Sequence, residues 1–170
     1  MVRRKQLSNT LTLISTPHFP YNTDRRNSGA HRALLGIGGN IGDTLRRFEH
    51  LFWVLQRSRL LEIIECSPIL RNPPFGYTQQ EDFYNALILV STKLPPKALL
   101  RYILRVEKRF GRKRTFQDAP RTLDIDMIYY EGVRMETERL NLPHPGHQSR
   151  ASVQIPLGYM REKIENTGMR

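Results

Sequence analysis

The stretch Pro120–Ile128, PRTLDIDMI, has the composition of a buried β-strand except for two aspartates. Side chains alternate across a strand, so Asp124 and Asp126 are predicted to share one face while the apolar residues occupy the other. On one strand the two carboxylates would lie roughly 6.5 Å apart. At an effective dielectric constant near 20, two like charges at that distance repel by about 2.5 kcal/mol. Something in the folded protein has to offset this repulsion.

Two interpretations of the carboxylate pair are open from these nine residues. A solvated face of a sheet would screen the charges. A bound divalent cation would neutralise them, and hard oxygen ligands are those that Mg²⁺ prefers. The neighbouring segments are needed to distinguish the two.

Apolar patterns before this stretch predict the remaining elements of the fold. Helical spacing predicts amphipathic helices over residues 44–57 and 96–110. Apolar segments rich in β-formers predict strands. These strands cover residues 33–38, 60–69, 83–92 and 123–128. The order β-α-β-β-α-β is typical of a ferredoxin-like α+β sandwich, with an antiparallel sheet, helices on one face and the other face open.

The chain of 170 residues has the length of one ordinary domain. Residues 1–30 are rich in Ser, Thr, Asn and Arg and contain no acidic residue before Asp24. This composition also resembles an organellar presequence, but a flexible extension is the simpler interpretation. The sequence therefore predicts a flexible N-terminal extension over residues 1–30 and one folded domain over residues 31–170.

Charge and cysteine content restrict the partners and the compartment. The chain has 27 Lys and Arg against 16 Asp and Glu, a formal net charge of +11. This excess favours an anionic partner, which could be nucleic acid, an acidic membrane surface or a polyphosphate. A single cysteine, Cys66, excludes an intrachain disulfide and suits a reducing cytosol, so a cytoplasmic location is predicted. No apolar run approaches the length of a membrane span.

Four glycines in GIGGNIG, residues 36–42, invite comparison with phosphate-binding loops. A dinucleotide-binding fingerprint that starts at Gly36 needs glycine at position 41, where Ile41 stands. No Gly-Lys-Ser/Thr sequence follows, as a P-loop requires. A tight turn between a strand and a helix is the better interpretation.

Cations cluster between the second helix and the aspartate strand. They are Arg112, Lys113, Arg114 and Arg121. Arginine makes bidentate contacts to phosphate, and Mg²⁺ bridges phosphate oxygens. Cations beside a carboxylate pair therefore indicate a polyphosphate ligand, although a solvated charge run remains an alternative for Lys113.

An aromatic ring and an amide share a face near the start of the strand at 83–92. Phe83 and Asn85 have the same parity, and a ring plane beside a donor–acceptor amide could hold a flat heterocycle. A core aromatic with a hydrogen-bonded asparagine is the simpler alternative. His144 and His147 in PHPGH have too few companions for a zinc site.

In combination, five motifs resemble the 6-hydroxymethyl-7,8-dihydropterin pyrophosphokinase family of folate biosynthesis. They are GGN at 38–40, PPFGYTQQEDFYNA at 73–86, Glu107 with GRKR at 111–114, APRTLDIDMI at 119–128 and LPHP at 142–145. The resemblance covers about residues 33–157 and keeps the family order. Its most specific part is the Arg-x-x-Asp-x-Asp core.

The resemblance implies that ATP donates its β,γ-pyrophosphoryl group to the hydroxymethyl oxygen of the pterin, which leaves AMP. It implies that Asp124 and Asp126 hold two Mg²⁺ ions and act in catalysis together with Arg112 and Arg121. The implied nucleotide-binding residues are Glu107, Arg112, Arg114, Arg121 and His144. The implied pterin-binding residues are Asn72, Pro73, Phe75, Phe83 and Asn85.

The implied partners are ATP and the hydroxymethyl dihydropterin, without nucleic acid or membrane, and docking to other folate-pathway enzymes is a further hypothesis. Four positions depart from the family pattern. Gln117 stands where a basic residue is usual, Ala119 replaces glycine, and Pro145 and Ser152 stand where aromatic residues are expected. These departures concern loop closure and pterin affinity, not the class of reaction.

Two other functions compete with this hypothesis. Ferredoxin-like sheets with strong positive charge also bind RNA through aromatic residues on the open face. The strand DFYNALILV lacks the Lys/Arg-Gly-aromatic signature, and two aspartates on the sheet would repel phosphates. A metal-dependent nucleotide hydrolase is the second alternative, and pterin-dependent consumption of ATP would distinguish it from the transferase.

Overall fold

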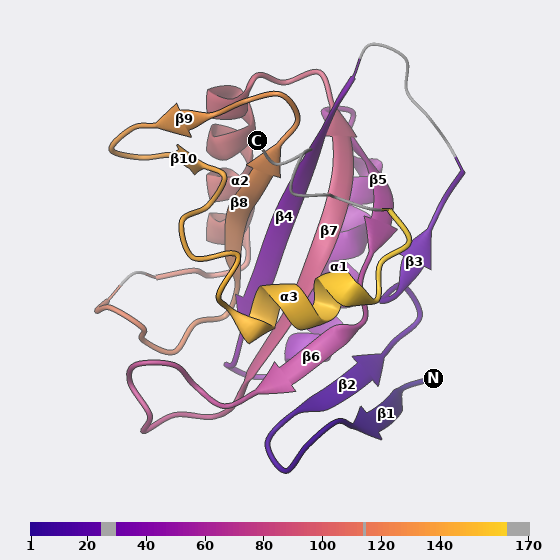
Figure 1. The fold of residues 1–170 in the computed structure, drawn as a ribbon, viewed down its shortest axis with the longest axis vertical. Coiled ribbons are helices and arrows are strands. Elements are labelled where there is room, and N and C mark those ends of the chain that lie inside the picture. The colour runs from indigo at the N-terminus through magenta and orange to yellow at the C-terminus, as the bar shows by residue number, and fades with distance from the viewer. Residues whose placement is uncertain (25–29, 114, 163–170) are drawn as a thin grey trace.

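The computed structural model describes residues 1–24, 30–113 and 115–162. These residues form an α+β fold with a large antiparallel sheet and three helices (Figure 1). The helices are α1 (Thr44–Arg57), α2 (Pro96–Arg109) and α3 (Ala151–Gly158). The strands of the main sheet are β1 (Arg3–Gln6), β2 (Thr12–Ser15), β3 (Tyr21–Asn22), β4 (His31–Gly39), β5 (Leu61–Cys66), β6 (Ile69–Asn72), β7 (Phe83–Thr92) and β8 (Asp124–Tyr130). A separate ribbon pairs β9 (Met135–Glu136) with β10 (Asn141–Leu142).

The main sheet has the order β1-β2-β6-β7-β4-β8. β5 pairs with the same edge of β7 as β6 does, but with a later part of that strand, and β3 pairs with the other edge of β5. The central strand β4 runs antiparallel to both β7 and β8. In this register Gly38 lies opposite Asn85 on one side and opposite Asp124 on the other. Only β4 therefore separates β7, which carries Asn85, from β8, which carries Asp124.

Both predicted helices are confirmed, as α1 and α2. Asp43 caps α1, because its Oδ1 accepts the N–H of Arg46 at 3.1 Å. α2 starts at Pro96, and the chain leaves it through Gly111, whose φ of +79° favours glycine. The strand predicted at 60–69 is in fact two strands, β5 and β6, which both pair with β7 and are separated by Ser67 and Pro68. None of the described helices is long and apolar enough to cross a membrane.

The helices do not all cover one face of the sheet, which corrects the predicted arrangement. α1 and α2 pack on one face over the main core, while α3 crosses the opposite face (Figure 1). The cluster under α3 is smaller. It consists of Leu34, Ile64, Leu87, Leu89, Ile128, Tyr129 and Met160, with Val153 and Leu157 packed against it. The sheet face predicted to be open is therefore covered by α3 at one end, which leaves the rest for a site.

The first 22 residues contribute three strands to the sheet, which corrects the prediction of a flexible extension over residues 1–30. β1 and β2 form a hairpin, and β2 pairs with β6. Ile14 and Phe19 are buried in the main core. Short, polar strands such as RRKQ lack the apolar alternation that would have identified them. Residues 25–29 of the predicted extension lie outside the described part of the chain.

A carboxylate on α1 anchors this N-terminal segment. Glu49 Oε2 accepts the Thr16 hydroxyl at 3.0 Å and the His18 N–H at 3.1 Å, and its Oε1 lies 2.8 Å from His18 Nδ1. The His18 ring also stacks on Phe52, with centroids 4.2 Å apart. The hairpin is thus fixed to the domain at the end of β2 as well as along β6.

Candidate active site

Asp124 and Asp126 lie on the sheet face that α3 partly covers, and the predicted parity of the aspartate strand is confirmed. Their neighbours Ile125 and Met127 are buried in the core on the opposite face. Across β4 the aspartates face Gly38 and Gly36. A Cβ on Gly38 would come within 2.7 Å of Asn85 Oδ1, so a larger residue there would displace the amide. The glycines of GIGGNIG therefore provide a flat floor between the aspartates and β7.

Without a bound cation, the negative charges of Asp124 and Asp126 are unfavourable next to each other. Burial, followed by the charges of Asp124 and Glu107, raises the pKa of Asp126 to about 7, while Arg150 and Arg121 act in the opposite direction. No cluster of three or more potential metal ligands occurs within the described ranges. Two carboxylates suit Mg²⁺, which commonly takes one or two protein carboxylates and completes its shell with water and substrate phosphates. The donor set thus fits Mg²⁺ held jointly with a polyphosphate.

Two arginines lie beside Asp124. Arg121 Nη1 is 3.3 Å from Asp124 Oδ2, and Arg112 Nη2 is 3.9 Å from its Oδ1. Arg121 Nε also donates to the carbonyl of Ala119 at 3.0 Å, and its guanidinium lies 4.9 Å from the centre of the Phe83 ring. Arg121 therefore spans the space between the aspartate pair and the aromatic wall predicted to bind the heterocycle.

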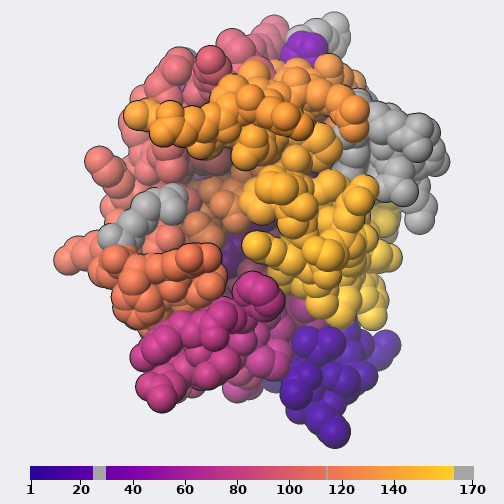
Figure 2. All heavy atoms as spheres, turned by 60° about the vertical axis from the view of Figure 1, so that its left-hand side comes forward, coloured from indigo at the N-terminus to yellow at the C-terminus, as the bar shows by residue number. Residues whose placement is uncertain are grey.

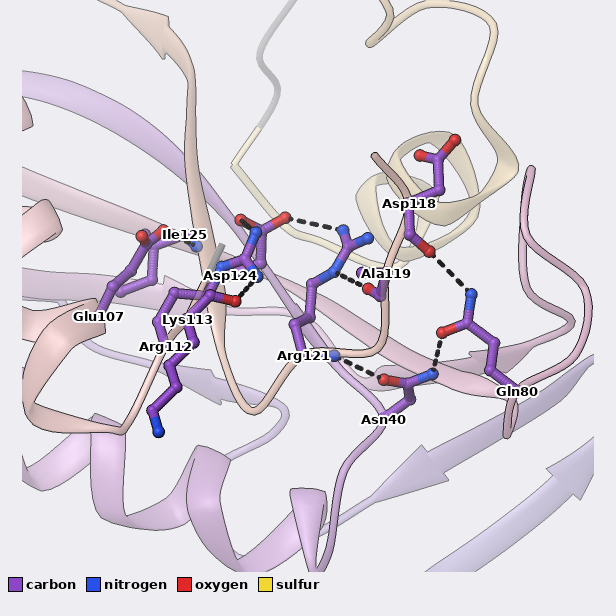
Figure 3. A network of polar contacts seen from close by, with 10 residues as sticks. All are labelled: Asn40, Gln80, Glu107, Arg112, Lys113, Asp118, Ala119, Arg121, Asp124 and Ile125. Atoms are coloured by element: carbon purple, nitrogen blue, oxygen red, sulfur yellow. Dashed lines mark hydrogen bonds and ion pairs between the residues drawn. The ribbon is translucent and has the colours of Figure 1, made fainter. Parts of the chain in front are cut away.

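Asn40 positions the backbone of Arg121 and connects it to a second loop. Its Oδ1 accepts the Arg121 N–H at 3.0 Å, and its Nδ2 donates to Gln80 Oε1 at 2.8 Å (Figure 3). Gln80 Nε2 donates in turn to the carbonyl of Asp118 at 2.8 Å. This role of Asn40 is not visible in the sequence, because these contacts join residues about 40 and 80 positions apart. The one available signal is its place in the GGN motif.

Two adjacent cavities meet at the aspartate pair. The larger, of about 610 Å³, contains Asn72, Phe83 and Asn85, and the smaller, of about 340 Å³, contains Arg112 and Thr115. They share four residues, namely Asp118, Arg121, Asp124 and Asp126. Figure 2 shows the opening as a hollow between the segments around residues 73–82 and 115–120 and α3. The arrangement suits two ligands that react with each other at the shared residues.

All five residues predicted to bind the pterin line the larger cavity. They are Asn72, Pro73, Phe75, Phe83 and Asn85. Asn85 Nδ2 donates to Asn72 Oδ1 at 2.7 Å, so the two amides orient each other. Phe83 is buried, whereas Phe75 is 78% exposed at the rim. The structure brings these residues together as predicted, and their contact with a pterin remains a prediction.

The residues predicted to bind the nucleotide are less closely grouped. Arg112 and Arg121 line the smaller cavity, while His144 lines the larger one. Glu107 is buried and accepts the N–H of Ile125 at 2.7 Å, and it lines neither of the two cavities. Arg114 lies outside the described residues. Burial, Arg150 and His147 lower the pKa of His144, which favours a neutral ring near neutral pH.

Arg150, which precedes α3, is a candidate that the sequence analysis missed. It lines the larger cavity, and it is close enough to Asp126 and His144 to lower the pKa of both. A single arginine in the polar stretch HQSRAS gives little sequence signal. Of the four departures from the family pattern, Gln117 lines the smaller cavity and Ser152 the larger one.

Comparison with known proteins identifies the family. Residues 34–162 match the family described as 7,8-dihydro-6-hydroxymethylpterin-pyrophosphokinase. The chain is 41% identical over 140 residues to the 2-amino-4-hydroxy-6-hydroxymethyldihydropteridine pyrophosphokinase of Campylobacter jejuni, covering 82% of this chain and 89% of the relative. The enzyme of the same name from Helicobacter pylori is 40% identical over 147 residues, covering 85% and 90% of the two chains.

A longer relative matches the same region. The folic acid synthesis protein FOL1 of Dictyostelium discoideum is 35% identical over 136 residues, which cover 80% of this chain but 20% of the relative. The match to the family spans the aspartate pair, the arginines and every residue that lines the two cavities except Leu11. The chain belongs to the 7,8-dihydro-6-hydroxymethylpterin-pyrophosphokinase family.

Proposed function

We propose that this protein transfers the β,γ-pyrophosphoryl group of ATP to the hydroxymethyl oxygen of 6-hydroxymethyl-7,8-dihydropterin, in folate biosynthesis. The observation that carries the proposal is the meeting of two cavities at Asp124, Asp126 and Arg121. The smaller, arginine-lined cavity suits the nucleotide phosphates, and the larger one suits the pterin. The names of the relatives from C. jejuni and H. pylori support the same reaction.

Asp124 and Asp126 are the proposed ligands for two Mg²⁺ ions. Bound there, the ions would neutralise phosphate charge and lower the pKa of the attacking hydroxyl group. Arg112 and Arg121 flank Asp124 and would bind the phosphate oxygens. Glu107, Arg114 and His144 remain proposed nucleotide-binding residues. Since His144 lines the larger cavity, its contact would have to lie near the boundary between the two ligands.

The pterin is proposed to lie over Gly38, between the aspartates and the amide of Asn85. Phe83 offers a ring face, and Arg121 lies over that ring on the side of the aspartates. Asn85 Nδ2 donates to Asn72 Oδ1, and each amide has both donor and acceptor capacity, which suits the mixed polar edge of a pterin. Pro73 and Phe75 would cover the ring from the loop that precedes β7.

The finer description of the fold, a ferredoxin-like sandwich, is part of the proposal. The order β6-β7-β4-β8 and the crossings through α1 and α2 support it. The proposed catalytic domain is residues 31–170, to which the N-terminal hairpin adds two strands. An RNA-binding module finds no support, because α3 covers part of the sheet face that RNA would need.

A cytoplasmic location and docking to other enzymes of folate synthesis are also proposals. The single cysteine, Cys66, is buried and free, which agrees with a reducing compartment. FOL1 of D. discoideum supports the idea of docking, since the region matched there is part of a much longer chain.

The identity of the spent nucleotide tests the proposed reaction. With ATP, Mg²⁺ and the hydroxymethyl dihydropterin, we expect AMP and pterin diphosphate in equal amounts, because attack at the β-phosphorus breaks its bond to the α-phosphate oxygen. Chromatography of the quenched mixture measures both products. Stoichiometric ADP would contradict the pyrophosphokinase proposal, and free phosphate without modified pterin would indicate a hydrolase.

Replacing Asn85 with alanine should weaken pterin binding by about 1 to 3 kcal/mol, because it leaves polar atoms of the ring unpaired. It also removes the donor to Asn72 Oδ1. Calorimetric titration with the pterin and with ATP measures both affinities, and ATP binding should change little. Asn141→Ala, an exposed position outside both cavities, is the matched control. Equal losses for both ligands would indicate a folding defect instead of a pterin contact.

A further inference from the structure

The N-terminal hairpin contributes a residue to the larger cavity. Leu11, which directly precedes β2, is half-buried and lines this cavity. Figure 2 shows the hairpin beside the segment around residues 70–80 and α3, both of which border the hollow. Leu11 lies outside residues 34–162, the part of the chain that matches the family. The hairpin therefore adds an apolar wall that the matched region alone does not supply.

Strand register fixes the place of Leu11 relative to the aspartates. Thr12 pairs with Arg71, so Leu11 lies beside Asn72 on the adjacent strand β6. From there the cavity floor crosses Phe83 and Asn85 on β7 and Gly38 on β4, and it reaches Asp124 on β8. Four strand spacings of about 4.8 Å place Leu11 and Asp124 about 19 Å apart, at opposite ends of the floor.

Hydrogen bonds within the hairpin turn hold Leu11 in this position. Its carbonyl accepts the N–H of Leu7 at 2.9 Å and of Ser8 at 3.2 Å. The Ser8 hydroxyl accepts the N–H groups of Thr10 at 3.2 Å and Leu11 at 3.1 Å. Since Glu49 anchors the other end of β2, Leu11 belongs to an ordered wall of the cavity.

We propose that Leu11 closes the end of the pterin cavity and limits the size of the substrate edge opposite the hydroxymethyl group. This inference rests on the proposed function. The hydroxymethyl oxygen has to lie near the aspartate pair to react, and the rings then extend over Gly38 toward Asn85. The opposite edge, which carries the 2-amino group, points along the floor toward Asn72 and Leu11. An isobutyl side chain there favours a compact edge and excludes a bulkier one.

Two pterins and two leucine variants test the proposal. The probes are 6-hydroxymethyl-7,8-dihydropterin and its 2-ethylamino analogue, which is longer at the edge opposite the hydroxymethyl group. Leu11→Ala should weaken binding of the parent pterin by about three- to tenfold and leave kcat nearly unchanged. It should raise the kcat/KM ratio of the analogue to the parent by about tenfold, because the space vacated by the side chain accepts the ethyl group.

Leu7→Ala is the matched control, since Leu7 lies in the same turn and is also half-buried but does not line the cavity. It should change neither affinity nor selectivity. ATP affinity and melting temperature report on folding, and Leu11→Val provides the same comparison if the alanine variant is too unstable.

Each outcome separates this inference from the function on which it rests. A wild-type protein that neither binds nor converts the parent pterin would overturn the proposed function. If the wild-type protein binds and converts the parent pterin but the Leu11 variants have unchanged pterin affinity and selectivity, the proposed function stands. Only the proposal that Leu11 closes the end of the pterin cavity would then be overturned. Equal effects of Leu7→Ala and Leu11→Ala would also overturn it, because they would reflect the hairpin in general.

Discussion

Replacing Asp126 with asparagine is expected to reduce turnover by about a thousandfold or more, because it removes one of the two proposed ligands of a metal ion that would supply several kcal/mol of transition-state stabilisation. The same change should raise the melting temperature of the metal-free protein at pH 8. The carboxylate of Asp126 is buried beside Asp124 and Glu107, so its negative charge destabilises the folded protein in the absence of a cation. A loss of activity combined with a gain of stability is typical of a residue selected for binding a ligand.

The pH dependence of this stability gain follows from the pKa of Asp126. The folded pKa is about 7, while an aspartate in an unfolded chain titrates near pH 3.9. Between these values the folded state holds a proton that the unfolded state has lost, so the stability of the wild-type protein falls as pH rises. Asp126→Asn removes this dependence. The difference in melting temperature between variant and wild type should be smallest near pH 4 and largest above pH 7.

Thermal melts in chelator at several pH values, together with turnover in excess Mg²⁺, measure both effects. Adding Mg²⁺ should narrow the stability difference, because the ion stabilises only the wild-type site. Asp82→Asn, a half-exposed aspartate outside both cavities, serves as the control for the substitution itself. Near-normal turnover in Asp126→Asn, or a lower melting temperature at pH 8, would contradict the proposed metal site.

Replacing Arg121 with alanine is expected to lower kcat by about a hundred- to a thousandfold, the usual cost of removing one preorganised group that stabilises transition-state charge. Arg121 lies 3.3 Å from Asp124 and lines both cavities, so it can contact the transferred group throughout the reaction. Its guanidinium also lies over Phe83, so a smaller loss of pterin affinity is expected.

Single-turnover rates and pterin affinity separate these two effects of Arg121→Ala. Lys113→Ala removes a positive charge from the same segment, but Lys113 is exposed and lines neither cavity, so it should leave both quantities almost unchanged. A loss limited to pterin affinity would indicate that Arg121 contacts the pterin and not the transferred phosphates.

The features that the sequence predicted correctly depend on local periodicity. Alternation along the aspartate strand placed Asp124 and Asp126 on one face, and helical spacing located α1 and α2 to within one residue of their ends. The same parity argument placed Phe83 and Asn85 on the floor of one cavity. Such patterns are visible because each of these elements packs one face against a continuous core.

The elements that the sequence analysis missed lack this pattern. α3 has the sequence ASVQIPLG, without an apolar stripe and with Pro156 inside it, and it packs through a few residues on a small cluster. β1 is exposed along its whole length. Both elements are stabilised by tertiary contacts, so their own sequences contain little evidence of them. Asn40 was missed for a related reason, since its role consists entirely of contacts with distant loops.

The bracing of two loops by Asn40 has a thermodynamic consequence for the two substrates. The segments at 73–82 and 115–120 are joined through Gln80 and also through the rings of Tyr77 and Phe116, whose centroids are 5.3 Å apart. One segment borders the larger cavity and the other the smaller one. A ligand that orders one segment therefore also orders part of the other, so the second ligand loses less conformational entropy when it binds. Linkage makes this effect reciprocal, so the factor by which ATP tightens pterin binding equals the factor by which the pterin tightens ATP binding.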